Sequence, residues 1–341
     1  MSKHIATALA IAGTLIALPA FAQEQKLRVA DSLPVGHFFA EHGTKFWMAE
    51  VERLTKGKVK FEYYPAEQLG KAKDMLTLTQ TGVADVGYVV PSYVSEKMPL
   101  SAVAELPGSF ATGCAGTLAY YKLATGDGVL AKKEFAPNHV RMIFTLVLPP
   151  YQLFTNKAKL DSYKDIQGLK LRTAGGAMDA TARAFGGVPV RMAAPEIYES
   201  LSRGTIDGML LPYASVISYD LASLSKSATT GENFGSAVLT YVISEAKWKK
   251  LSPDIQAAIA RAGEAATKNA CETTDRDVKT DIAKIREKGA HMASFPDSER
   301  EAVKTISAGI AQEWAQGLDK RGKPGSEVLA AYRKALAEGA R

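Results

Sequence analysis

Apolar residues recur along the chain with strand-like and helix-like spacing in alternation. In the first half, strand, helix, strand, helix and strand are expected in turn over residues 26–30, 38–55, 58–64, 71–81 and 85–90. The same order returns in the second half over residues 169–172, 175–185, 188–192, 195–203 and 206–211. This alternation is typical of an α/β fold with a largely parallel sheet.

One passage occurs twice in closely similar form. In each copy a helix ends on glycine, an aspartate follows three residues later, and an apolar strand runs into proline and then tyrosine. The first copy contains Gly82, Asp85, Pro91 and Tyr93, and the second contains Gly204, Asp207, Pro212 and Tyr213. The repeat favours two related α/β lobes, although a chance recurrence of common turn residues gives a similar pattern.

Open α/β sheets collect their ligands at the carboxyl ends of their strands. That rule selects Tyr88, Val90 and Tyr93 in the first half, and Leu211 and Tyr213 in the second.

Arg172 also ends a predicted strand. Its planar guanidinium offers two parallel hydrogen bonds to a carboxylate. The strand pattern alone, however, favours a surface position for this arginine.

The remainder of the chain is mainly helical, after a strand at residues 238–243. A helix of more than 30 residues is expected over residues 252–288, with Ser252 as its cap, and its length suggests that it crosses both lobes. The chain crosses between lobes near Pro149 and Gly235. We expect a signal peptide at 1–22, a first lobe of 23–148 plus 237–276, a second lobe of 149–236 plus 277–320, and a C-terminal helix at 321–341.

The N-terminus has the order of a secretory signal. Lys3 and His4 precede an apolar run at residues 5–20, and the small residues Ala20 and Ala22 follow. The run is shorter than the ~20 residues that a membrane-spanning helix needs. We therefore expect cleavage near Ala22 and a periplasmic product.

Composition adds two constraints. The net charge of +6 comes from scattered basic residues without a basic stripe, which argues against a nucleic-acid partner. Cys114 and Cys271 are expected to form a disulfide in an oxidising compartment, the alternative being two separate buried thiols.

Motifs for catalysis and metal binding are missing from the sequence. There is no nucleophile elbow, phosphate-binding loop or H-E-x-x-H, and His37 and His42 are five residues apart, so we expect neither metal nor cofactor. Asp31 and His37, in the turn after the first strand, are candidates for ligand contact. An exported enzyme would need a base among these two residues and Asp207.

Five stretches of the chain resemble the solute-binding subunits of tripartite ATP-independent periplasmic (TRAP) transporters, of the DctP type. They are residues 65–70 (PAEQLG), 155–156 (TN), 165–172 (DIQGLKLR), 196–198 (EIY) and 204–208 (GTIDG). The resemblance implies two lobes, a helix spanning both, and a ligand held in a cleft that closes. It also implies that Arg172 pairs with the ligand carboxylate, and that the receptor serves a membrane permease driven by an ion gradient.

Departures from the family pattern indicate the kind of ligand. Sugar-acid receptors of the family often have a second arginine where this chain has residues 151–154 (YQLF), an asparagine at Leu211 and an acidic residue at Val90. The expected pocket would leave the hydroxyls of a sugar acid unpaired. It consists of Tyr88, Val90, Tyr151, Phe154, Leu211 and Tyr213 around Arg172. We therefore expect a monocarboxylate with an aromatic or apolar body. The alternatives are a C4-dicarboxylate receptor, which would lack an arginine for the second charge, and the binding protein of an ABC importer.

Overall fold

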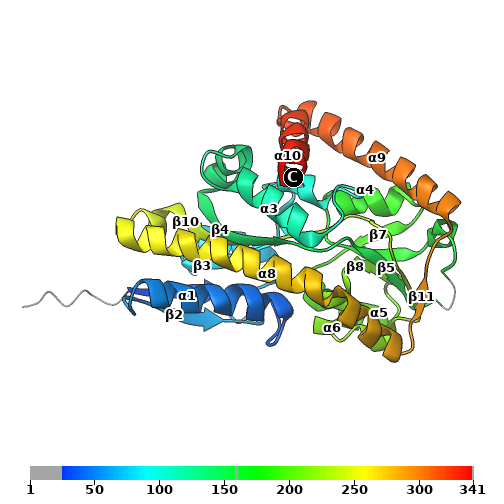
Figure 1. Ribbon diagram of the computed structural model, residues 1–341, viewed down its shortest axis with the longest axis horizontal. Helices are drawn as coiled ribbons and strands as arrows, with labels where there is room; N and C mark the ends of the chain where they lie inside the picture. Colours follow the sequence, from blue (N-terminus) through cyan, green and yellow to red (C-terminus); the bar gives the residue numbers. More distant parts are fainter. Residues whose placement is uncertain (1–24, 158–159, 340–341) are drawn as a thin grey trace, which may run out of the picture.

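Two β-sheets form the centres of two lobes in the computed structural model, which describes residues 25–157 and 160–339 (Figure 1). The first sheet has the order β2-β1-β3-β10-β4, with β1 (Gln25–Ala30), β2 (Val59–Tyr64), β3 (Val86–Val89), β4 (Val140–Val147) and β10 (Val238–Ser244). The second has the order β11-β9-β5-β8-β6-β7, with β5 (Gln152–Thr155), β6 (Lys170–Thr173), β7 (Val188–Arg191), β8 (Gly208–Leu211), β9 (Ser227–Thr229) and β11 (His291–Ala293). The predicted two-lobed α/β fold is confirmed, and the predicted signal peptide lies outside the described residues.

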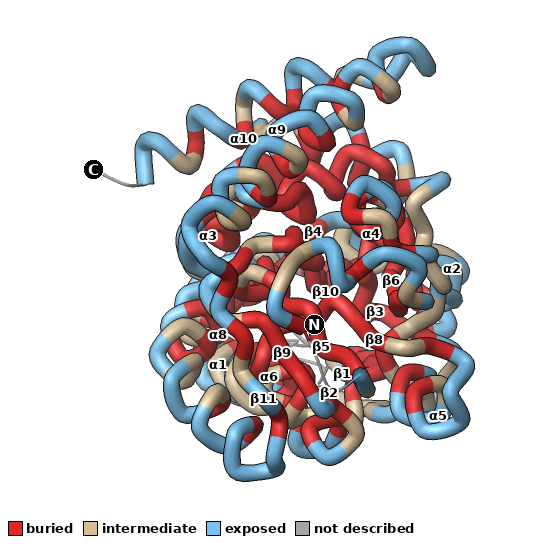
Figure 2. Tube along the Cα trace, turned by 90° about the vertical axis from the view of Figure 1, so that its right-hand side faces the viewer, coloured by how far each residue is buried: buried red, intermediate tan, exposed pale blue. Residues whose placement is uncertain are grey.

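Strands within a strand–helix–strand unit are parallel, whereas strands next to a crossing between the lobes are antiparallel to their neighbours. β1 runs parallel to β2 and β3, and β6 runs parallel to β7 and β8, as strand–helix–strand units require. β10 is antiparallel to β3 and β4, and β5 is antiparallel to β8 and β9. These antiparallel strands follow or precede the crossings between lobes. The central strands β3 and β10 of the first sheet and β5 and β8 of the second are buried (Figure 2).

The helices of the strand–helix–strand units are short. The α-helices up to the second crossing are α1 (Phe46–Leu54), α2 (Met75–Gln80), α3 (Gly113–Ala124), α4 (Ala177–Ala184), α5 (Ile197–Ser202) and α6 (Tyr213–Ser218). Two π-helices, η1 (Ala40–Lys45) and η5 (Ala131–Phe135), occur as well. The 3₁₀-helices are η2 (Ala72–Asp74), η3 (Pro91–Val94), η4 (Ser101–Glu105), η6 (Ala136–Asn138), η7 (Tyr163–Ile166), η8 (Ala194–Glu196) and η9 (Ala222–Leu224). The helix expected at 38–55 therefore starts with a π-helical segment before α1.

The repeated passage has the same hydrogen bonds in both lobes. The Asp85 carboxylate accepts the backbone N–H of Arg28 at 2.9 Å, and the Asp207 carboxylate accepts that of Lys170 at the same distance. In each case the aspartate N–H also donates back to the carbonyl of that partner residue. Each aspartate thus ties the start of its own strand to the neighbouring parallel strand, which makes the two lobes structural repeats.

Helix α8 (Pro253–Glu287) contains 35 residues and runs along both lobes (Figure 1). It packs against α1, α3 and β4 in the first lobe and against α6 in the second. Ser252 occupies the N-cap position as expected, but its side chain makes no capping hydrogen bond, so that part of the prediction was wrong. The short helix α7 (Glu245–Trp248) precedes α8.

A disulfide joins Cys114 on α3 to Cys271 on α8, with 4.6 Å between the Cα atoms, as predicted. The start of α3 is held to α8 a second time, because the Asp275 carboxylate accepts the N–H groups of Gly113 and Cys114 at 2.9 and 2.8 Å. The first lobe is therefore fixed to the long helix by both a covalent and a charged contact.

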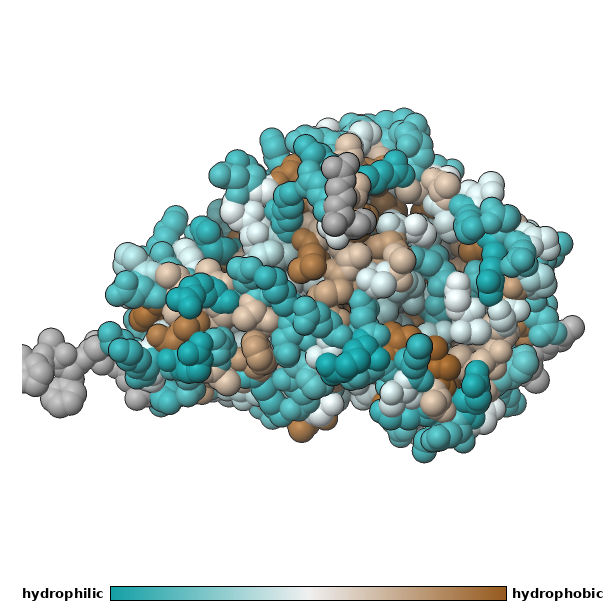
Figure 3. Space-filling view, viewed as in Figure 1, coloured by the Kyte–Doolittle hydropathy of each residue, from teal (hydrophilic) through white to brown (hydrophobic). Residues whose placement is uncertain are grey.

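The last two helices return toward the first lobe. α9 (Asp297–Asp319) packs on α4 of the second lobe, and α10 (Gly325–Gly339) packs on α9 and on α3 (Figure 1). Among the described residues, no helix combines the length and the apolar character needed to cross a membrane. The face shown in Figure 3 is mostly hydrophilic, with small separate hydrophobic patches.

The two segments that connect the sheets, near Pro149 and near Gly235, lie side by side. The backbone N–H of Leu148 donates to the carbonyl oxygen of Ala237, and that of Tyr151 donates to the carbonyl oxygen of Gly235 at 2.8 Å. Gly235 has a φ of +106°, and a Cβ there would lie 2.5 Å from the carbonyl oxygen of Glu105. Only glycine fits this approach, so the crossing can pass close to η4.

Candidate ligand-binding site

Arg172 is the third residue of β6, and its side chain is almost completely buried, with 1% of the residue exposed. It pairs with Val190 of β7 on one side and Met209 of β8 on the other. The surface position that the strand pattern favoured was therefore wrong. A central strand of a covered sheet has no exposed face, which the four-residue pattern of β6 did not reveal.

The polar partners of Arg172 are uncharged. Its Nε donates to the carbonyl oxygen of Met192 at 3.1 Å, and its Nη2 lies 3.4 Å from the hydroxyl oxygen of Tyr93. Within the described part of the chain, no carboxylate forms a salt bridge with this guanidinium. The charge of Arg172 acts on the buried carboxyl of Glu105 and lowers its pKa, but burial outweighs this effect and raises that pKa to about 7. A buried cation without a directly bonded counter-charge is costly, so this arginine is suited to binding an anion.

Around Arg172 the two lobes enclose a cavity. Seven of the ten predicted ligand contacts line it: His37, Tyr88, Val90, Tyr93, Tyr151, Arg172 and Leu211. The volume is about 20 Å³, counted as the space open to the centre of a water-sized sphere. That is room for about one or two water molecules. A larger ligand therefore enters only when the lobes separate or side chains turn.

Residues that sequence reasoning missed complete the lining. They are Leu148, Ala174, Ala194, Ser215, Tyr219, Ala237 and Leu239. Leu148 and Ala237 belong to the crossing segments, which were predicted as crossings but not as walls of the site. Ser215 and Tyr219 lie on or just after α6, so extending the strand-end rule to the following helix would have found them.

Three tyrosine hydroxyls of this cavity have no hydrogen bond to any described residue. They belong to Tyr88, Tyr151 and Tyr219. Tyr151 and Tyr219 lie close enough to Arg172 for its charge to act on their hydroxyls, and Tyr88 is similarly close to the other two tyrosines. Burial raises the pKa of each phenol above its usual value, so all three are uncharged and can donate or accept a hydrogen bond. The walls are thus aromatic, with neutral polar groups at the ring edges.

His37 stands in the first lobe, opposite the lobe that supplies Arg172. Its Nδ1 accepts the backbone N–H of Phe39 at 3.1 Å, and its ring packs edge-on against Tyr219 with centroids 5.2 Å apart. Burial lowers the pKa of His37 to about 3, so the ring is neutral.

Asp31 is not part of the lining, although it was predicted to contact the ligand. Its carboxylate accepts hydrogen bonds from the Tyr63 hydroxyl (2.7 Å), the Tyr241 hydroxyl (2.5 Å) and the N–H of Leu33 (2.7 Å). Burial raises its pKa to about 6 against the effect of these bonds. Asp31 thus organises the turn that carries His37 instead of facing the cavity.

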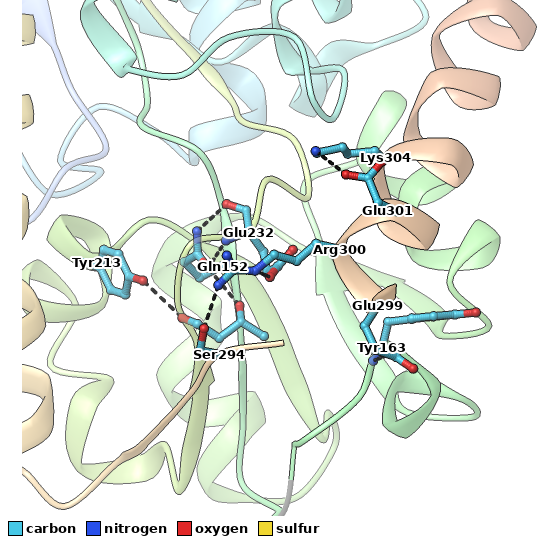
Figure 4. A network of polar contacts seen from close by, with 10 residues as sticks. Gln152, Tyr163, Tyr213, Glu232, Ser294, Glu299, Arg300, Glu301 and Lys304 are labelled. Atoms are coloured by element: carbon cyan, nitrogen blue, oxygen red, sulfur yellow. Dashed lines mark hydrogen bonds and ion pairs between the residues drawn. The ribbon is translucent and has the colours of Figure 1, made fainter. Parts of the chain in front are cut away.

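Phe154 and Tyr213 also lie outside the lining. Their rings meet edge-on with centroids 5.9 Å apart. The Tyr213 hydroxyl donates to the backbone carbonyl of Thr229, and Figure 4 shows Tyr213 in this polar network. Gln152 bonds to Glu232 in the same network, and Arg300 of α9 reaches both Glu232 and Ser294. Through this network Arg300 attaches α9 to the second sheet, so Tyr213 and Gln152 have structural partners.

Metal ligands do not gather anywhere in residues 25–157 and 160–339: no group of three or more histidine, cysteine, aspartate or glutamate side chains is placed to hold an ion. The chemistry that the site offers is therefore that of one buried cation, several neutral hydrogen-bonding groups and apolar walls.

Comparisons with known proteins agree with this geometry. The model of the DctP family, described as bacterial extracellular solute-binding protein, family 7, matches residues 35–317. The C4-dicarboxylate-binding periplasmic protein DctP of Rhodobacter capsulatus is 25% identical, covering 98% of this chain and 96% of that protein. A TRAP solute-binding protein of Rhodoferax ferrireducens, solved with copurified benzoate, superposes with a TM-score of 0.85 at 22% identity, covering 92% of this chain and 98% of that one.

A second solved structure, a TRAP periplasmic solute-binding protein of Bordetella bronchiseptica with bound (R)- and (S)-mandelate, has a TM-score of 0.82 at 25% identity and covers 92% of this chain and 99% of that one. The match of the family model spans most of the chain and includes Arg172 with all the residues that line the cavity. This chain belongs to family 7 of the bacterial extracellular solute-binding proteins, the solute receptors of TRAP transporters.

Proposed function

We propose that this receptor binds an aromatic or otherwise hydrophobic monocarboxylate, with Arg172 holding the carboxylate. The observation that carries the proposal is the buried guanidinium of Arg172, which meets only uncharged partners in a cavity walled by tyrosines. A ligand carboxylate there would supply a directly bonded counter-charge through two charge-assisted hydrogen bonds.

The cavity walls support an apolar ligand body. Tyr151, Val90 and Leu211, the three positions at which this chain departs from sugar-acid receptors, all line the cavity. A sugar acid would bring several hydroxyls to walls that are largely apolar, and unpaired buried hydroxyls weaken binding. The benzoate and mandelate found in two structurally similar receptors are acids of the proposed kind.

A C4-dicarboxylate is the main alternative, because the Rhodobacter relative is named for such ligands. Arg172 is the one lysine or arginine among the residues that line the cavity in the described chain. The second carboxylate would therefore be buried without a cation, which is unfavourable by several kcal/mol. Membership of the TRAP receptor family argues against the ABC-importer alternative.

Catalysis is not part of the proposed function. Of the three candidate bases, only His37 lines the cavity, and its pKa of about 3 makes it a weak base at neutral pH. Asp207 instead accepts the backbone N–H of Lys170, which lowers its pKa. The family is one of solute-binding transport proteins.

We further propose that the protein is exported, processed near Ala22, and delivers its ligand to a TRAP membrane permease. The strands of each sheet support lobes formed by residues 23–148 plus 237–276 and residues 149–236 plus 277–320. The helix at 321–341 would then be an addition that rests on the first lobe through α3.

A melting-temperature screen of the mature protein against organic acids tests the ligand class. A bound ligand stabilises the folded state by mass action, so the best ligands give the largest shifts. We expect benzoate, phenylacetate, mandelate or branched 2-oxo acids to lead. A sugar acid or a C4-dicarboxylate as the strongest ligand by calorimetry would overturn the proposal.

A further inference from the structure

His37 and Arg172 line one cavity from two different lobes. His37 belongs to the turn after β1 in the first lobe and is 2% exposed, whereas Arg172 belongs to β6 in the second. A ligand whose carboxylate binds Arg172 therefore presents its other end toward the first lobe. The hydrogen-bonding character of His37 then decides what that end can be.

The tautomer of His37 follows from its one hydrogen bond. Because Nδ1 accepts the N–H of Phe39, Nδ1 carries no proton. A neutral imidazole has one protonated nitrogen, so the proton is on Nε2. His37 thus offers the cavity a hydrogen-bond donor and no acceptor.

The Nε2–H of His37 has no hydrogen bond to any described residue. The two rings beside it, Phe38 and Tyr219, are 4.5 and 5.2 Å away between centroids. A buried donor without an acceptor costs free energy, so a ligand that supplies an acceptor gains affinity over one that does not.

The other polar groups of the cavity do not discriminate in this way. The hydroxyls of Tyr88, Tyr151, Tyr219 and Ser215 can each rotate to donate or to accept. They accommodate either kind of ligand group, whereas the Nε2–H of His37 requires an acceptor.

We propose that His37 is a specificity-determining residue that donates to an uncharged oxygen of the ligand. The receptor then takes aromatic monocarboxylates that carry a hydroxyl or carbonyl oxygen besides the carboxylate. This inference rests on the proposed function, since it places the carboxylate at Arg172.

A second carboxylate at His37 is disfavoured by charge. The ring of His37 is neutral and offers no compensating charge. Asp31 lies in the same lobe, and its negative charge acts on the hydroxyls of Tyr88 and Tyr219 at that side of the cavity. An uncharged oxygen avoids this repulsion and still accepts the hydrogen bond.

Calorimetry with matched acids tests the inference on the wild-type protein. The pairs are phenylacetate against mandelate and phenylglyoxylate, and benzoate against 3-hydroxybenzoate. Mandelate and 3-hydroxybenzoate add one hydroxyl to their partner, and phenylglyoxylate has a carbonyl in place of the CH2 group of phenylacetate. We expect at least one oxygenated acid to bind about five- to tenfold more tightly than its partner, the value of one hydrogen bond. Equal or weaker binding of every oxygenated acid would overturn the role of His37 and leave the anchoring by Arg172 intact.

Two variants separate the donor from the shape of the site. His37→Leu removes the donor and should reduce the preference within a pair to less than about twofold, whereas His37→Gln, which keeps an N–H group, should retain part of it. A general disturbance of the site lowers the affinity for both acids of a pair and therefore cancels in the ratio of their Kd values. An unchanged ratio in His37→Leu contradicts the inference. Failure of wild-type protein to bind any of these acids would instead reject the proposed function itself.

Discussion

The hydroxyl of Tyr93 lies 3.4 Å from Nη2 of Arg172, across the boundary between the two lobes. Tyr93 belongs to η3, directly after β3 of the first sheet, whereas Arg172 is a residue of the second. The same hydroxyl oxygen accepts the N–H of Ala194 at 2.9 Å, again from the second lobe. Arg172, the proposed anchor of the carboxylate, therefore also contacts the first lobe through Tyr93.

Replacing Arg172 by alanine should remove high-affinity binding of the acid. The ligand carboxylate would be buried without a cation, at a cost of roughly 3–5 kcal/mol, which is at least about 100-fold in Kd. The melting temperature without ligand should not fall much, since the variant no longer buries an unpaired charge. Calorimetry and thermal unfolding measure the two quantities.

Arg203→Ala is the matched control for this prediction, because Arg203 is exposed and forms an ion pair with Glu199, four residues earlier. Its affinity for the acid should equal that of wild type. An Arg172→Ala protein that folds and binds within a few-fold of wild type would show that the carboxylate is held elsewhere.

Tyr93→Phe should weaken the closed form while keeping the aromatic ring of Tyr93 in the cavity wall. The variant leaves the N–H of Ala194 without its acceptor and removes one partner of Arg172, a loss of roughly 1–1.5 kcal/mol. We expect a five- to tenfold faster dissociation of the ligand with a smaller change in association, because closure contacts act mainly on the dissociation rate. Stopped-flow fluorescence of the tryptophans measures both rates.

The control is Tyr198→Phe, which removes a hydroxyl from an exposed tyrosine in the same lobe as Arg172. Its rates should match those of wild type. If Tyr93→Phe also dissociates at the wild-type rate, the contact between Tyr93 and Arg172 does not contribute to closure.

The features that sequence reasoning predicted well are local ones. The unit formed by a helix, a glycine, an aspartate and a strand occupies about a dozen residues, so Asp85 and Asp207 could be recognised as equivalent from spacing alone. The proposed role of Arg172 came from the block of residues 165–172 that it ends, because a four-residue strand does not reveal whether it is central or at an edge.

The features that were missed depend on contacts between distant segments. Leu239 lines the cavity because β10 enters the first sheet between β3 and β4, a pairing that no local pattern encodes. Phe154 lies outside the lining because the side to which a strand residue points depends on register, whereas Tyr213 is the first residue of α6 and not a strand residue. Phe154 pairs with Ala228 of β9, and the Tyr213 hydroxyl donates a hydrogen bond to the backbone carbonyl of Thr229 in the same strand.

The buried Glu105 should make stability depend on pH. Glu105 is 1% exposed, one of its carboxyl oxygens has no hydrogen bond to a described residue, and burial raises its pKa to about 7. The folded state therefore holds a proton between pH 4.5 and 7 that the unfolded state has released. Stability then declines as pH rises through this range, by at most about 3 kcal/mol from this group.

Glu105→Gln removes this ionisation. The variant should melt at a higher temperature than wild type at pH 8 and at nearly the same temperature at pH 5. Asp31 and Glu134, whose pKa values burial raises to about 6 and about 7, act in the same direction and remain in both proteins. Exposed Glu301 provides the control Glu301→Gln, and a Glu105→Gln profile parallel to wild type at all pH values would refute the assignment.

Tyr151→Arg should move the specificity of the receptor toward ligands with two carboxylates. Tyr151 is 2% exposed, lines the cavity, and has its backbone fixed by hydrogen bonds to Gly235 and Phe234 of the other crossing segment. The new guanidinium would therefore start from a fixed position beside Arg172. Two buried cations repel each other, so the variant without ligand should be less stable than wild type.

A dicarboxylate such as succinate would relieve that repulsion, and its effect on the melting temperature is the measurement that decides. We expect succinate to stabilise Tyr151→Arg by several degrees and wild type by little, while benzoate loses affinity for the variant because an aromatic wall has become a charge. Tyr198→Arg places the same charge on an exposed residue and should leave the response to both acids unchanged. If succinate already stabilises wild type as strongly as benzoate does, a single buried arginine is enough for two carboxylates, and the selection of monocarboxylates by this site is wrong.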